Sequence, residues 1–336
     1  MKKKTIILSL FSTIIVPILC IFIGTMDIFM NKLFLIYFSY IDVSFFVASN
    51  HHMICFLHVV SFILFKKKVL TCTIKLPKYY YLIKLLISPL DLGLFYVILK
   101  FSTIETAQNI KVLLPFFFIL FPFFIIIDFR KPYRNGYLEC LIFSTSLISS
   151  YMGMVYYFEF TQVLLTLTWV FFFSANIFMD MKIYHDIELS NRVDMYGITM
   201  IFWNSLISVI SSMLMSIALG EYEQFNYIQK DQIWGFIFGI FSIGTIRAIN
   251  LIILYYKYEP EYNHTYLFST IQLLTFITSR LISKDTIVFP ILTYVAFLFG
   301  FICYLILQIQ EIRKKENMTS LNGFEKVDKG LEIQPN

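Results

Sequence analysis

Charged residues are scarce in this chain: Asp, Glu, Lys and Arg make up 15% of its 336 residues, whereas hydrophobic residues make up 58%. This composition leaves little sequence for a water-soluble domain. The formal net charge is +5. Because the basic residues lie in the polar segments and tails and not on one face, we expect no nucleic-acid partner.

Cysteine pairs and catalytic motifs are also lacking. The five cysteines include no C-x-x-C pair, which argues against structural disulfides. His51 and Cys55 lie one helical turn apart, a spacing that suits a metal. Since no second ligand cluster is evident, we interpret them as polar residues near a helix end and expect no metal site. No Gly-rich phosphate loop, nucleophile elbow or metalloprotease-type helix is present, so we expect neither an enzyme nor a cofactor.

The chain has long apolar runs instead. A bilayer core about 30 Å thick needs about 20 apolar residues per helix, and helices satisfy their own backbone hydrogen bonds in lipid. These runs predict an all-α integral membrane protein with ten transmembrane helices. The predicted spans cover residues 5–28, 44–65, 80–99, 104–127, 137–154, 160–179, 196–219, 233–255, 264–283 and 287–308.

The distribution of Lys and Arg predicts the orientation of these spans. Basic residues concentrate in segments 2–4, 66–78, 130–134 and 313–315, which all fall on one side if the spans alternate. The positive-inside rule therefore places both termini in the cytosol. We predict one transmembrane domain at residues 1–308, followed by a polar, disordered cytosolic tail at 309–336.

A short internal sequence repeat favours an architecture of two similar halves. Residues 110–114 read Ile-Lys-Val-Leu-Leu, and residues 271–275 read Ile-Gln-Leu-Leu-Thr. Both lie in the fourth helix of a predicted five-helix half, at about 1–155 and 156–308. Because five is odd, the second half would be inverted relative to the first, a plan that places a binding site near the midplane in many transporters.

Charged residues inside predicted spans are the first candidates for such a site, because a charge at the bilayer centre costs about 2.5–3.5 kcal/mol. The candidates are Asp27, Lys84, Asp91, Glu105, Lys111, Glu139, Arg247 and Arg280. For Lys84, Glu105 and Glu139 the alternative is an extended side chain that reaches the headgroups, and for Asp27 it is an interfacial position. We expect Lys111, with Gln108 one turn before it, and Arg247 to face a cavity, where cations suit an anionic substrate.

Three further features have two interpretations each. Trp203 and Asn204 could stack on and hydrogen-bond a planar base, or could make a polar contact between helices. Glu221 and Glu223 could hold a divalent metal in a glycosyltransferase, but ordinary loop charges are the favoured reading. The spacing of Gly235 and Gly239 favours helix packing over substrate contact.

Several segments together resemble the nucleotide-sugar transporters of the drug/metabolite transporter superfamily. They are the pair Asn31-Lys32, the stretch from Ile104 to Phe117, the stretch from Phe202 to Glu221, and the ninth span from Asn263 to Asp285. The resemblance implies ten helices in two inverted repeats. Together with the charged residues inside the spans, it predicts substrate binding by Asn31, Lys32, Gln108, Lys111, Trp203, Asn204, Arg247, Gln272 and Arg280.

The chain departs from the family pattern at two positions. Family members usually carry a Lys in the ninth helix, where this chain has Gln272, and a second amide where it has Ser205. Lys111 or Arg280 could supply the missing positive charge.

The expected function is therefore exchange of a cytosolic nucleotide sugar for a lumenal nucleoside monophosphate, in the Golgi or endoplasmic reticulum membrane. Two alternatives stay open: a sugar-phosphate/phosphate exchanger, and a multispanning membrane glycosyltransferase. The expected partners are a nucleotide sugar or another anionic phosphorylated small molecule and the lipid bilayer, with a homodimer as an open alternative.

Overall fold

A computed structural model describes residues 15–65, 78–101, 160–188 and 193–257, together with Ile302 and Ile306. The helices in these ranges are α2 (Val16–Tyr37), α3 (Ser44–Phe65), α4 (Lys78–Phe101), α8 (Phe160–Glu188), α9 (Val193–Ala218) and α10 (Ile233–Lys257), with the short 3-10 helix η3 (Glu221–Tyr227). No strand occurs in the described ranges. Five helices, α2, α3, α4, α9 and α10, are long and apolar enough to cross a bilayer, as expected of an integral membrane protein.

The predicted spans match the described helices closely in five places. Helix α3 occupies the predicted residues 44–65, and α8 and α10 begin at the predicted residues 160 and 233. Helix α4 extends its predicted span 80–99 by two residues at each end, and α9 begins three residues before the predicted span 196–219 and ends one residue short of it. Helix α8 is 29 residues long and carries a shorter apolar segment, Leu164–Asp180. The predicted spans 104–127, 137–154, 264–283 and 287–308, and the tail, lie outside the described residues, so the ten-helix repeat stays a prediction.

The end of the first span was predicted wrongly. The span was expected to end at residue 28, but α2 continues to Tyr37. Its polar residues are satisfied inside the bundle: the Asn31 side chain donates to the Asp27 carbonyl over 2.8 Å, and Lys32 Nζ donates to the Leu99 carbonyl. Residues that look like a polar helix end in sequence therefore lie within the helix.

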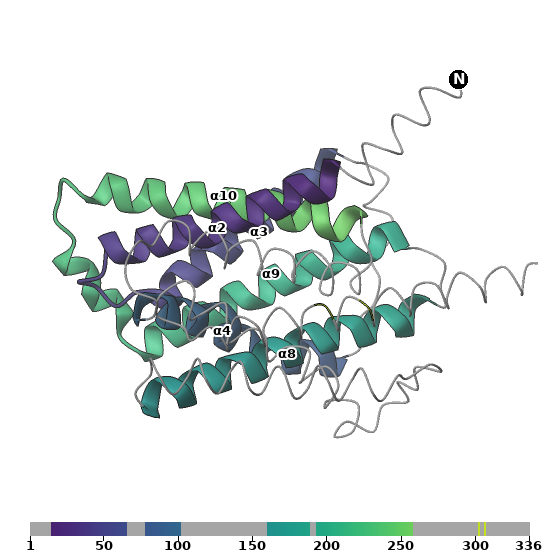
Figure 1. Ribbon diagram of the computed structural model, residues 1–336, viewed down its shortest axis with the longest axis horizontal. Helices are drawn as coiled ribbons and strands as arrows, with labels where there is room; N and C mark the ends of the chain where they lie inside the picture. Colours follow the sequence, from purple (N-terminus) through teal and green to yellow (C-terminus); the bar gives the residue numbers. More distant parts are fainter. Residues whose placement is uncertain are drawn as a thin grey trace, which may run out of the picture.

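The helices lie roughly along the long axis of the molecule (Figure 1). Helix α10 packs on α2 and α3, α4 packs on α8, and α9 lies between these groups in contact with α3, α4 and α10. The α2–α3 loop (residues 38–43) and the α9–α10 connection (residues 219–232) meet at one end of the bundle, where the Tyr40 hydroxyl donates to Gln232 Oε1 over 2.6 Å. We call this the loop end. The predicted topology requires these two connections to share a side.

Apolar packing closes the loop end. The largest cluster of buried side chains comes from the loop-end halves of the helices, including Phe38, Phe45, Leu99 and Phe236. Phe95 of α4 stacks on Trp169 of α8 with ring centroids 5.0 Å apart. Because aromatic side chains bury large apolar areas, this cluster supplies much of the packing between helices.

Glycine permits close helix contacts at several positions, Gly197 and Gly239 among them. A Cβ atom on Gly239 would lie 2.7 Å from the Phe34 ring, and one on Gly197 would lie 1.8 Å from the Tyr255 carbonyl oxygen. Gly235, in contrast, has open space around it. Of the predicted packing pair Gly235 and Gly239, only Gly239 therefore packs against another helix.

Candidate functional site

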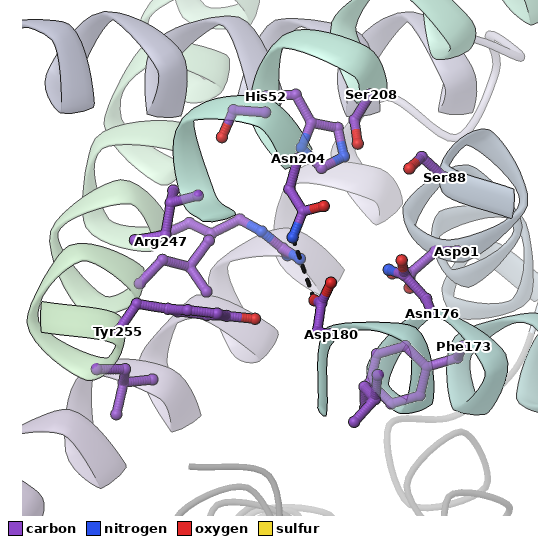
Figure 2. A pocket seen from close by; sticks show the side chains of 15 residues that line it. His52, Ser88, Asp91, Phe173, Asn176, Asp180, Asn204, Ser208, Arg247 and Tyr255 are labelled. Atoms are coloured by element: carbon purple, nitrogen blue, oxygen red, sulfur yellow. Dashed lines mark hydrogen bonds between the residues drawn. The ribbon is translucent and has the colours of Figure 1, made fainter. Parts of the chain in front are cut away.

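A cavity of about 170 Å³ lies among α3, α4, α8, α9 and α10. Its charged lining residues are Asp91, Asp180 and Arg247. Its uncharged polar lining residues are His52, Ser88, Asn176, Asn204, Ser205 and Ser208. Figure 2 shows Arg247 and Tyr255 on one wall and Asp91 and Asn176 on the opposite wall. The described lining of the cavity therefore combines apolar surface with charges of both signs.

Lys84 and Asp180 form a buried ion pair beside the cavity. Lys84 Nζ lies 2.6 Å from Asp180 Oδ1, and the two side chains are 0% and 4% exposed. Lys84 also donates to the Asn176 carbonyl over 3.2 Å and to its side-chain oxygen. The alternative in which Lys84 extends to the headgroups is wrong, because its ammonium group has its partners inside the bundle.

The Asp180 carboxylate also holds the side chain of Asn204, the residue predicted to contact a base, in one orientation. Asn204 Nδ2 donates to Asp180 Oδ2 over 3.1 Å (Figure 2), and the Tyr80 hydroxyl donates to Asn204 Oδ1 over 2.5 Å. Asn176 Nδ2 donates to Asp91 Oδ2 over 2.7 Å. One network thus joins α4, α8 and α9, and fixes the rotamers of the side chains that line this part of the cavity.

A second network joins α2, α3, α4 and α10. Arg247 Nη1 lies 3.5 Å from Asp27 Oδ2, and Asn31 Nδ2 donates to Asp27 Oδ1 over 3.0 Å. His51 Nδ1 is 2.5 Å from the Tyr96 hydroxyl, and the Tyr96 side chain is also hydrogen-bonded to Arg247, which connects the two pairs. The cavity lies between the two networks, since Arg247 comes from the second and Asp91, Asn176, Asp180 and Asn204 from the first. Asp27 is thus a partner of Arg247 within the bundle, and not an isolated interfacial residue.

The structure brings two of the predicted substrate-binding residues, Asn204 and Arg247, to the same cavity. Asn31 and Lys32 are not among its lining residues. Trp203 is not either; its ring packs edge-on against Tyr81 with centroids 5.1 Å apart. Gln108, Lys111, Gln272 and Arg280 lie outside the described residues. Substrate binding by these nine residues stays a prediction.

Sequence reasoning missed Asp180 and Asn176. The predicted sixth span ended at residue 179, which placed Asp180 in a loop, whereas α8 runs on to Glu188. The spacing of the two residues was the available signal, because positions four apart lie on one face of a helix. His51, His52 and Cys55 do lie near one another on α3, but in the described ranges no group of three or more His, Cys, Asp or Glu side chains could hold a metal ion.

Glu221 connects the α9–α10 connection to the start of α3. Helix α9 ends at Ala218, and Gly220 follows with a left-handed φ of 68°. The Glu221 carboxylate then accepts hydrogen bonds from the Phe45 and Phe46 amides over 3.0 and 2.7 Å. It caps the first turn of α3, where N–H groups have no partner within the helix and a negative charge is favoured.

Because Glu221 caps α3, Glu221 and Glu223 do not act together as an acidic pair. Both Glu221 oxygens are engaged by main-chain amides, and Glu223 is exposed. The pair therefore does not form a two-carboxylate metal site here. Replacing Glu221 would disturb α3 whatever the protein does, so such a variant would not separate a carrier from an enzyme.

Glu221 also predicts a pH dependence of stability. Burial raises the pKa of its carboxyl above the usual 4.5, and the amides of Phe45 and Phe46 and the Ser216 side chain oppose that rise. A carboxyl whose pKa is higher in the folded state binds its proton more tightly when folded, so stability increases as pH falls from the raised pKa towards about 4.5. We expect Glu221→Gln to abolish this increase, measured as melting temperature between pH 7.5 and pH 4.5.

The matched control for that experiment is Glu223→Gln on the same short helix. Because the Glu223 side chain is exposed, this variant should keep the pH profile of the parent. A Glu221→Gln variant that gains as much stability on acidification as the parent would contradict the assignment.

The chain matches no protein-family model and no curated protein. The resemblance to nucleotide-sugar transporters therefore stays a prediction.

Proposed function

We propose that this protein is a membrane carrier that moves a phosphorylated solute by alternating access, with a nucleotide sugar exchanged for a nucleoside monophosphate as the leading case. The observation that carries the proposal is the gathering of Asp91, Asp180 and Arg247 around one cavity between long apolar helices. Charged residues in such helices are costly and mark solute pathways. A carrier of polar solutes accounts for that cost.

Arg247 is the proposed ligand for the phosphate group. Its contact with Asp27, at 3.5 Å, is longer than a normal hydrogen bond. Its Nε has no hydrogen-bond partner among the described residues. A guanidinium group can bind phosphate with two parallel hydrogen bonds, and the Arg247 side chain lies on the cavity wall (Figure 2).

The size of the cavity favours a second candidate within the same class. At about 170 Å³ it is smaller than the roughly 300–1,000 Å³ of typical small-molecule sites. A nucleotide sugar would need the helices to separate, as alternating access requires. A sugar phosphate exchanged for inorganic phosphate would need less widening.

Counterflow in proteoliposomes tests the proposal. Vesicles preloaded with GMP, UMP or inorganic phosphate would be offered labelled GDP-mannose, UDP-sugars or a sugar phosphate. Uptake stimulated by one nucleoside monophosphate is the expected result, and stimulation by phosphate alone would favour the second candidate. No exchange under any pairing, from protein with a cooperative unfolding transition, would contradict the carrier function.

Arg247→Gln is the informative variant in this assay. We expect it to lower exchange by about tenfold to a hundredfold, because a hydrogen bond to a charged group is worth about 1.5–3 kcal/mol. Lys230→Gln is the matched control, since this exposed residue lies in the α9–α10 connection away from the cavity. Equal exchange by the two variants would exclude Arg247 from solute binding.

The location in the Golgi or endoplasmic reticulum membrane and the cytosolic position of both termini belong to the same proposal. The position of the termini is supported by the distribution of Lys and Arg along the chain, and the organelle by the resemblance alone. No described contact favours a glycosyltransferase.

A further inference from the structure

At the loop end, polar contacts connect segments that are far apart in the chain. Glu221 accepts the Phe45 and Phe46 amides, and Tyr40 donates to Gln232. These contacts join residues 38–46 to the α9–α10 connection. We call the Glu221 contacts with α3 the loop-end tie.

A second tie lies toward the opposite end of the bundle. The Lys84–Asp180 ion pair joins α4 to α8, and the hydrogen bond from Tyr80 to Asn204 joins α4 to α9. We call the Lys84–Asp180 pair the opposite tie. Like the loop-end tie, it connects a helix from the predicted first half to an element from the predicted second half.

The loop-end tie lies beyond one end of the cavity, and the opposite tie borders the cavity on the other side, since Asp180 itself lines it. Helix α3 begins at the loop end, and Phe45 precedes the lining residue His52 by seven positions, or about 10 Å of helix. Helix α4 runs in the other direction, since Lys100 near its end donates to the Ile41 carbonyl in the α2–α3 loop over 2.8 Å. Lys84 precedes the lining residue Asp91 by the same seven positions, toward the opposite end.

Both ties consist of polar groups that water can satisfy once the helices part. Water can replace the Glu221 oxygens at the first turn of α3, and it can solvate Lys84 and Asp180 if the opposite end opens. The net cost of exchanging such hydrogen bonds for water is small compared with their strength in a dry interior. Apolar packing on the same surfaces has no such compensation.

We propose that the loop-end tie and the opposite tie are the two gates of the carrier, opened alternately during transport. The inference rests on the proposed carrier function. If it is correct, weakening one gate shifts the population toward the state that is open on that side. Weakening one gate must then also lower access to the cavity from the other side, because a larger population of one open state leaves a smaller population of the other.

Access can be measured with a cysteine in the cavity. Ser208 lines the cavity and is 4% exposed, and Ser208→Cys changes one atom. In the full-length chain with its five native cysteines replaced, this thiol would be labelled with a membrane-impermeant reagent in sealed vesicles of either orientation. Glu221→Ala, which removes both acceptor oxygens, should raise the labelling rate from the loop end on the order of tenfold, the factor for about 1.4 kcal/mol, and lower the rate from the opposite end.

The reverse pattern is expected when the opposite tie is removed. Asp180→Asn and, as a second variant, Lys84→Gln each leave one charge without its partner while the helices are packed, whereas water can solvate that charge once this end opens. Each change should raise labelling from the opposite end and lower it from the loop end. Glu223→Ala and Lys78→Gln, both at exposed residues, are the matched controls and should label like the parent.

The reciprocal decrease separates a gate from a merely structural contact. If either variant raises labelling from both sides, or leaves both rates at the parent value, the proposal is overturned. The labelling needs no substrate, so its failure is distinct from a failure of the counterflow assay. Exchange in the counterflow assay without reciprocal labelling would retain the carrier and reject these gates.

Discussion

Asp180→Asn and Lys84→Met are each expected to lower the free energy of unfolding by about 3–5 kcal/mol, the range measured when one partner of a buried ion pair is removed. The pair is 2.6 Å apart, with side chains 0% and 4% exposed. Each single change leaves the other residue in a dry interior without its opposite charge. Unfolding of the purified protein in detergent, followed by fluorescence, gives the free energies.

The double variant Lys84→Met/Asp180→Asn should recover most of that loss. Replacing both charges removes the desolvation cost together with the attraction, so the sum of the two single effects should exceed the double effect by several kcal/mol. The matched control is Asp42→Asn, because Asp42 pairs with Lys100 but is 76% exposed. An exposed pair of this kind contributes about 0–1 kcal/mol. Equal small effects at Asp42 and Asp180 would show that the α4–α8 pair is not buried in the membrane protein.

Gly197→Ala should destabilise the protein by about 1–3 kcal/mol, the usual cost of overpacking a filled interior. A Cβ atom at this position would lie 1.8 Å from the Tyr255 carbonyl oxygen and 2.7 Å from its carbon. Both atoms belong to the main chain of α10, so α9 and α10 would have to separate. Tyr255 lines the cavity, and we therefore expect the same variant to impair transport.

Gly235→Ala is the matched control on α10. No atom lies within 4 Å of a Cβ atom at that position, and Ala favours a helix over Gly by about 0.8–1 kcal/mol. Its melting temperature should equal or exceed that of the parent. If Gly197→Ala were as stable as Gly235→Ala, the close approach of α9 and α10 would be wrong.

The length and hydropathy of the apolar runs were sufficient to predict the described helices. Helix α3 matches its prediction at both ends, and α8 and α10 match at their starts. An apolar run of about 20 residues has few structures available to it in lipid, because its backbone groups must bond to one another. This local argument needs no knowledge of the neighbouring helices.

The same argument failed where a polar residue had a distant partner. The first span was predicted to end at residue 28, although hydrogen bonds from Asn31 and Lys32 inside the bundle allow α2 to continue to Tyr37. Asp180 was placed in a loop, although Lys84 neutralises it 96 positions earlier in the chain. A hydropathy scale gives each polar residue the free-energy cost of burial in lipid without a partner. The actual cost is lower when a neighbouring helix supplies a hydrogen bond or an opposite charge.

By itself, the sequence thus determined that the chain forms long apolar helices suited to a membrane, and that a few charged residues must lie within them. Only the tertiary structure decided which charges meet: Asp180 with Lys84, Arg247 with Asp27, and Glu221 with the start of α3. The physical reason is that burial of a charge is stable only beside a partner, and helix packing determines which partners come within reach.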